Sequence, residues 1–142
     1  MKARRLDALE AEVLSRLGPF DAKTPEEATA RFLALGRVYV EFAHDNWRLW
    51  SSAFEHQANE SPALAAYMTR LGAILTNIEM PLGALLPDIS PKQCRLLARA
   101  LFAAVHGVVS LGLGGKVGPL ALDQIHEQVQ AILAATLKGL RA

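Results

Sequence analysis

Apolar side chains recur every three or four residues along most of the chain, which is the period of an amphipathic α-helix. Between these stretches, proline follows Thr or Ser in the pairs Thr24-Pro25, Ser61-Pro62 and Ser90-Pro91. A capping hydroxyl with proline at the first helical position is typical of a helix start, because proline has no N–H to leave unpaired there. No stretch alternates with the two-residue period of a strand. The pattern predicts an all-α protein.

Six helices are expected. The first ends at Leu17, before Gly18-Pro19, because glycine and proline commonly follow the last turn of a helix. The others are expected over residues 25 to 45, 46 to 56, 62 to 86, 91 to 115 and 120 to 140. No repeat, low-complexity tract or linker separates them, and 142 residues of which 51% are hydrophobic can form one core. We therefore expect one domain over residues 1–142.

Charge and cysteine content restrict the partners and the compartment. The 15 Lys and Arg residues nearly balance the 14 Asp and Glu residues, so the chain offers no sustained positive field for a phosphate backbone. We expect no nucleic-acid binding by these residues alone. The single cysteine, Cys94, excludes an internal disulfide and favours a reducing compartment, the cytoplasm. The uncharged run from Ala100 to Gly115 is shorter than the roughly 20 residues that cross a bilayer, so we expect a buried helix and no membrane contact.

Candidate catalytic groups are few. Glu41-x-x-His44 matches half of the Glu-x-x-His signature of di-iron bundles, but Glu79 is the one mid-helix candidate for the other ligands, which favours ordinary helix-surface residues. No Gly-x-Ser-x-Gly elbow is present, and Cys94 has no nearby histidine in the sequence. The glycine-rich tract at 112–115 follows a helix rather than a strand, which indicates a helix end and not a phosphate loop. We expect no enzyme, no metal and no cofactor.

Two features rise above this background. Both tryptophans lie within an aromatic group made of Tyr39, Phe42, Trp47, Trp50 and Phe54, which either fills the core or lines an apolar ligand cavity. The last two helices carry small residues at three- and four-residue intervals, which permit close helix crossings inside one chain or between two chains. These are Ala100, Ala103, Gly107, Ser110 and Gly114 on one helix and Ala131, Ala135 and Gly139 on the other.

The segment from Tyr39 to Trp50, YVEFAHDNWRLW, and the segment from Phe102 to Leu111, FAAVHGVVSL, resemble the C-terminal effector domain of TetR-type transcriptional regulators. The similar branch is named for a Trp-His-Gly motif, of which His106-Gly107 remain while Phe102 replaces the tryptophan. The resemblance spans nearly the whole chain. It implies a six-helix ligand-binding domain whose last two helices form a four-helix bundle in a two-fold homodimer.

The resemblance also implies a function for each segment of the chain. Residues 1–17 would be the end of a connecting helix, residues 24–115 the sensor helices, and residues 91–141 the dimerisation helices. A small apolar or amphipathic effector would shift the geometry of a DNA-binding domain. The helix-turn-helix of the family has no counterpart in these residues, so we expect DNA contact only through such a domain. A dimeric helical scaffold or adaptor without a small-molecule ligand is the alternative.

Candidate site residues follow from the resemblance and from the two features above. His106 either contacts the ligand or is a structural histidine bonded to a backbone carbonyl. The candidate ligand contacts are Tyr39, Phe42, Trp47, Trp50, Phe54, Met68, Leu71, Leu75, Phe102 and His106. The candidate dimer contacts are Ala100, Gly107, Ser110, Ile125, Val129, Ile132, Ala135 and Gly139.

Overall fold

The computed structural model describes the backbone of residues 2–48, 62–118 and 120–142, with side chains from residue 8 onward except at 49–70 and 119. Within these ranges the chain is helical, without a named strand. The helices are α1 (Lys2–Leu17), α2 (Pro25–Asp45), α4 (Pro62–Leu85), α5 (Pro91–Leu113) and α6 (Leu122–Arg141). The all-α prediction is confirmed.

The predicted short helix after residue 45 falls largely outside the described residues. Trp47 and Arg48 are helical, and the rest of that prediction lies in the part that the structure does not describe.

The start of α2 follows from its first residues. The Thr24 hydroxyl accepts the backbone N–H of Glu27 at 3.1 Å, and the Glu27 carboxylate accepts the backbone N–H of Thr24 at 3.1 Å. Ser90 and Gln93 form the same reciprocal pair at the start of α5. Each pair satisfies two N–H groups that the first helical turn leaves without a backbone partner. The predicted starts at Pro25 and Pro91 are confirmed.

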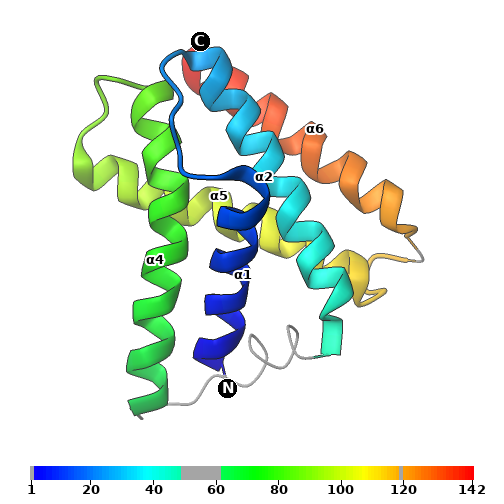
Figure 1. The fold of residues 1–142 in the computed structure, drawn as a ribbon. Coiled ribbons are helices and arrows are strands. Elements are labelled where there is room, and N and C mark those ends of the chain that lie inside the picture. The colour runs from blue at the N-terminus through cyan, green and yellow to red at the C-terminus, as the bar shows by residue number, and fades with distance from the viewer. Residues whose placement is uncertain (1, 49–61, 119) are drawn as a thin grey trace.

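The helices pack as a bundle in which α2 contacts all the others (Figure 1). It lies along α6 on one side and against α1 and α4 on the other, while α5 crosses the bundle and contacts α4 and α6. Two clusters of buried apolar side chains hold this arrangement together, both drawing on α2, α4, α5 and α6. Among the described side chains of α1, Leu9 and Val13 enter the first cluster and Leu17 packs against it, which gives α1 an apolar stripe along the bundle.

Arg31 fixes the end of α1 against α2. Its guanidinium donates to the backbone carbonyls of Leu17 at 3.0 Å and Gly18 at 2.8 Å. Gly18 has a φ of 71°, the left-handed conformation that commonly ends a helix and that a residue with a side chain adopts at a cost. The last turn of α1 is therefore bonded to the neighbouring helix.

A glycine sets how closely α2 and α6 approach. Gly36 is buried, and a Cβ atom on it would lie 2.8 Å from Leu133 Cδ1 and 3.1 Å from Val129 Cγ1. Beside this crossing, the Gln130 amide donates to the backbone carbonyl of Leu33 at 2.9 Å. A side chain at residue 36 would push the two helices apart or displace core residues of α6.

By length and composition α5 could cross a membrane, but the core helix of a soluble protein meets the same criteria. Its buried residues, such as Ala98 and Val109, face the other helices of the bundle. We expected a buried helix, but 28% of the most apolar 18-residue stretch of α5 is buried in the bundle. The expectation is therefore met by one face of α5 and not by the whole helix. The remaining apolar surface of α5 faces away from the chain's own core.

Cys94 lies near the start of α5 and is 8% exposed. Its thiol donates to the backbone carbonyl of Glu79 on α4 at 3.5 Å. Burial, and next the negative charge of Glu79, raise the pKa of this thiol. The thiol therefore stays protonated and packs as a small apolar group against α4.

Candidate functional site

A cavity of about 70 Å³ lies between the helices, and each of the five described helices contributes to its wall. The wall is almost entirely apolar, which is typical of sites for small organic molecules. Its lining residues are Leu9, Glu10 and Val13 of α1, Phe32, Leu35, Gly36 and Tyr39 of α2, Ile74, Asn77 and Ile78 of α4, Leu101, Phe102 and Val105 of α5, and Leu133 of α6.

The structure brings some of the candidate ligand contacts to this cavity. Tyr39 and Phe102 line it. Phe42, Trp47 and Leu71 are partly buried against the same core cluster but are not among the lining residues.

The other candidate contacts are not on the described wall. Leu75 is buried away from it, Trp50 and Phe54 fall outside the described residues, and the side chain of Met68 is also outside them. On α2 the wall continues from Tyr39 toward Phe32, one helical stripe that the spacing of the aromatic residues already indicates.

His106 contacts two residues of the cavity wall, Tyr39 and Phe102. A hydrogen bond of 2.9 Å joins its Nδ1 to the Tyr39 hydroxyl, and its ring stacks on Phe102 with the centroids 5.7 Å apart. Tyr39 in turn meets Phe102 edge-on at 5.6 Å. Burial lowers the pKa of His106, so the imidazole is neutral at pH 7. His106 thus positions both aromatic lining residues but is not itself among the lining residues, and its described partner is the Tyr39 hydroxyl rather than a backbone carbonyl.

Two polar residues are among the lining residues, although the wall presents almost no polar surface. Glu10 on α1 and Asn77 on α4 line the cavity on helices that pack against each other. The Asn77 amide donates one N–H to the backbone carbonyl of Ala73 at 3.2 Å and keeps a second N–H donor and an acceptor oxygen. Sequence reasoning missed both residues, since neither stands out from the polar positions on its helix.

The far side of α5 and α6 exposes apolar and small side chains. Among the candidate dimer contacts, Ala100, Ile132, Ala135 and Gly139 are exposed, and Gly107 and Ser110 are partly exposed. Leu96 and Leu111, exposed by 55% and 46%, extend this face of α5 at four-residue steps from Ala100 and Gly107. A groove of about 300 Å³ runs beside it, lined by Gly107, Val108, Leu111, Val117, Leu120 and Gln128. We call this surface the α5–α6 face.

Two of the candidate dimer contacts belong elsewhere. Ile125 and Val129 are 0% exposed in the single chain and sit in the first core cluster. They face α2 and α5 of their own chain, so the assignment of these two side chains to a surface between chains is corrected. The exposed stripe of α6 runs along Ile132, Ala135 and Gly139 instead.

Residues 32–136 match a family described as tetracyclin repressor-like, C-terminal domain. The match covers most of the chain, from α2 to α6. The chain belongs to this family. The resemblance to TetR-type effector domains is therefore confirmed, and the family is one of non-catalytic regulator domains. A comparison with curated proteins finds no match.

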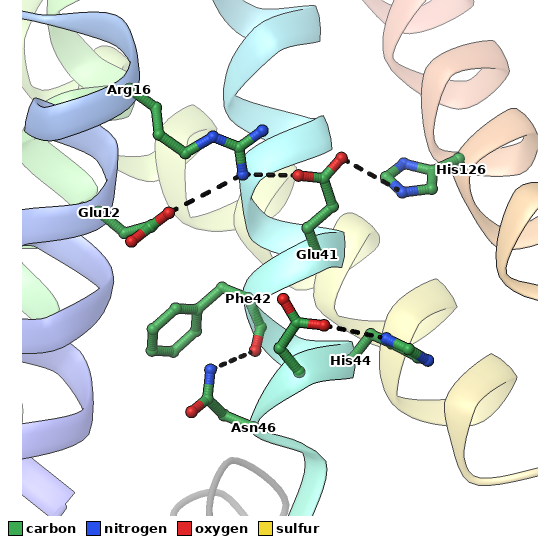
Figure 2. A network of polar contacts seen from close by, with 8 residues as sticks. Glu12, Arg16, Glu41, Phe42, His44, Asn46 and His126 are labelled. Atoms are coloured by element: carbon green, nitrogen blue, oxygen red, sulfur yellow. Dashed lines mark hydrogen bonds and ion pairs between the residues drawn. The ribbon is translucent and has the colours of Figure 1, made fainter.

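In this TetR-like domain, Glu41 of α2 connects α1 with α6 (Figure 2). Its carboxylate lies 2.6 Å from the guanidinium of Arg16 on α1 and 3.8 Å from Nε2 of His126 on α6. Arg16 also lies 4.0 Å from Glu12. The side chains of Glu41 and Arg16 are more than a third exposed, so solvent screens their attraction and each pair contributes less than about 1 kcal/mol.

The same view separates Glu41 from His44, the residues that match half of a di-iron signature (Figure 2). His44 Nδ1 lies 3.2 Å from the carboxylate of Asp45, on an exposed part of α2. Among the residues that the structure describes, no three His, Cys, Asp or Glu side chains gather as a metal site would require. The Glu41-x-x-His44 spacing therefore reflects two separate surface contacts in this TetR-like domain.

Proposed function

We propose that this chain is the effector-sensing and dimerisation domain of a TetR-like transcriptional regulator. The observation that carries the proposal is the apolar cavity, because its wall includes Leu9, Glu10 and Val13 of α1. A molecule in this cavity touches the helix that connects to the DNA reader in the family. A ligand that binds better to one position of α1 shifts the population toward that position, and with it the geometry of the DNA-binding domain.

DNA contact belongs to that separate domain in this proposal, because the net charge of +1 gives these residues no field for nucleic acid. The domain works in the cytoplasm, a setting that suits its single, buried thiol.

Ligand binding is tested with toluene, an apolar molecule without a charged group. Toluene at millimolar concentration should raise the melting temperature of the protein by mass action. Val105→Phe adds a ring to the cavity wall and should abolish the rise, whereas Met80→Phe, at an exposed position of α4 that does not line the cavity, should leave it intact. An equal rise in both variants would place the binding site elsewhere.

The size of the cavity favours the second candidate function, a dimeric scaffold without a ligand. At about 70 Å³ the cavity is smaller than the roughly 150 Å³ that accommodates benzene, so a ring-shaped ligand must displace lining side chains. If toluene and related apolar compounds leave the melting temperature unchanged while the protein remains dimeric, the scaffold function replaces the sensor function.

The homodimer proposed here uses the α5–α6 face. A dimer would bury Leu96, Leu111 and Ile132, whose exposure is costly for a single chain in water. Small residues such as Ala135 and Gly139 allow two α6 helices to cross closely at a two-fold axis.

The dimer is tested by charge substitution at two neighbouring positions of α6. Ala135 and Ala134 are both exposed in the single chain, but Ala134 points away from the α5–α6 face by helical geometry. Ala135→Arg buries an unpaired charge in both copies and should convert the dimer to a monomer of 15.4 kDa in sedimentation. Ala134→Arg should sediment as the unmodified dimer. An unmodified chain that sediments as a monomer at tens of micromolar contradicts this part of the proposal.

A further inference from the structure

Arg31 of α2 holds the C-terminal end of α1 through two backbone carbonyls. Its guanidinium donates one N–H to the carbonyl of Leu17 at 3.0 Å and another to that of Gly18 at 2.8 Å. Carbonyls in the last turn of a helix have no partner within the helix and carry its partial negative charge, so a cation suits them. The Arg31 Nε is buried without a hydrogen-bond partner among the described residues. The side chain is therefore committed to the end of α1.

This attachment is directional and lies beside the cavity. A planar guanidinium that donates to two acceptors fixes their orientation as well as their distance. Phe32, the next residue of α2, and Leu35, one turn further on, both line the cavity. The same part of α2 therefore forms a portion of the cavity wall and holds the end of α1.

The rest of α1 is held in a different way. Arg16 also makes a polar contact with α2, through Glu41, and it belongs to the same last turn of α1. Toward the N-terminus, Leu9 and Val13 contact the bundle through apolar packing and line the cavity. Apolar contacts have no preferred direction, so they resist a small tilt less than forked hydrogen bonds do. Among the described side chains, α1 thus has a fixed end and a cavity-facing part with more freedom.

We propose that Arg31 is a positioning residue of the sensor, because it fixes the point about which α1 tilts when a molecule occupies the cavity. This inference rests on the function proposed above and assigns the fixed end to one side chain. A helix rises about 1.5 Å per residue, so Leu9 lies about 12 Å and Arg4 about 20 Å from Leu17. A tilt that moves Leu9 by ~1 Å then moves Arg4 by ~1.6 Å and Ser15 by ~0.25 Å.

Distances between nitroxide labels in the full chain test the fixed end. Cys94→Ala is present in every sample, so that labels attach only at introduced cysteines. One label is placed at Ala134, on an exposed part of α6, and the other at Arg4 or at Ser15. Dilution with unlabelled chain restricts the measured pairs to one copy, and double electron–electron resonance records them with and without millimolar toluene. Toluene should change the distance from Arg4 at least about threefold more than the distance from Ser15.

Substitutions of Arg31 assign this difference to its side chain. Arg31→Met removes both donors and should bring the ratio of the two changes below about twofold, because the end of α1 can then move as well. The matched control is Arg37→Met at an exposed position of the same helix, which removes an equal charge and should leave the ratio unchanged. Arg31→Lys keeps the charge without the planar fork and should give an intermediate ratio, which decides the question if Arg31→Met does not fold.

A second readout needs no bound molecule. Without toluene, the distances between Ser15 and Ala134 should spread more widely in Arg31→Met than in Arg37→Met. Equal widths overturn the inference, as does a toluene-induced change at Ser15 as large as that at Arg4 in the unmodified protein, while ligand binding itself stands. If toluene changes neither the distances nor the melting temperature, the sensor function fails, and the widths alone decide whether Arg31 fixes the end of α1.

Discussion

Replacing Gly36 with alanine tests whether the close crossing of α2 and α6 depends on the missing side chain. The added Cβ would lie 2.8 Å from Leu133 Cδ1 and 3.1 Å from Val129 Cγ1, so at least one neighbour must move. Val129 is 0% exposed and stiff because its side chain branches at Cβ, and Leu133 is 4% exposed. We therefore expect Gly36→Ala to strain the core.

The magnitude has two opposing parts. Alanine in a helix interior is favoured over glycine by about 1 kcal/mol. Overpacking of a well-packed core costs about 1–3 kcal/mol. Gly72, in the interior of α4, is exposed, and a Cβ atom on it would meet nothing within 4 Å, so Gly72→Ala should show the propensity gain alone. The free energies of unfolding of the two variants should differ by about 1–3 kcal/mol, with Gly36→Ala the less stable.

Urea unfolding followed by circular dichroism measures this difference. All samples must have the same protein concentration, because dimerisation makes the apparent free energy of unfolding depend on it. Gly36→Val should lie below Gly36→Ala, because it adds two further methyl groups at the same crossing. If Gly36→Ala stabilises the protein as much as Gly72→Ala does, the approach of α2 and α6 is not limited by residue 36 and the reasoning is refuted.

Four other substitutions, with Thr76→Ala as a control, test contacts described above. Tyr39→Phe removes the hydrogen bond to His106 and should lower the free energy of unfolding by about 0.5–1.5 kcal/mol in denaturant titrations. Burial lowers the pKa of His106 in the folded state, so the unfolded chain takes up a proton there first, and the free energy of unfolding should fall as pH drops below about 6.5. His106→Gln should reduce this loss when unfolding is measured between pH 7.5 and pH 5. Glu41→Gln should cost less than about 1 kcal/mol, and the cost should shrink further in 0.5 M salt, because its ion pairs are exposed. Thr24→Ala should cost about 1 kcal/mol through loss of the cap of α2, whereas Thr76→Ala on the exposed side of α4 should change thermal unfolding little.

Much of the fold follows from local signals in the sequence. The starts of α2 and α5 are set by Thr24-Pro25 and Ser90-Pro91, where the capping hydroxyl and the side chain three residues later lie within one turn. Such contacts depend on neighbours in the chain, so the sequence is sufficient to place them.

The cavity depends on contacts between helices, and the sequence specifies these less directly. Tyr39 could be named in advance because aromatic residues commonly form cavity walls, and Phe102 because its segment resembles TetR-type domains. Glu10 and Asn77 could not, since a polar residue on an amphipathic helix reaches a cavity only at particular helix rotations. Gly36 likewise has no local signal, because its role is set by Val129 and Leu133, which are remote in the chain.

The correction at α6 has the same origin. Its apolar positions form a stripe wide enough for two contact surfaces. Periodicity does not say which edge faces the chain's own core, and α2 takes the edge that contains Ile125 and Val129. The other edge, with Ile132, remains exposed.

The rate at which the single thiol of the chain reacts can report local opening of the bundle. Cys94 is the sole cysteine in the sequence, and it is shielded between the start of α5 and the end of α4. A thiol reagent can reach it only when these two helices separate, so its labelling rate under native conditions reports how often that local opening occurs. A small molecule that holds the helices together slows the labelling even if it leaves the fluorescence of both tryptophans unchanged.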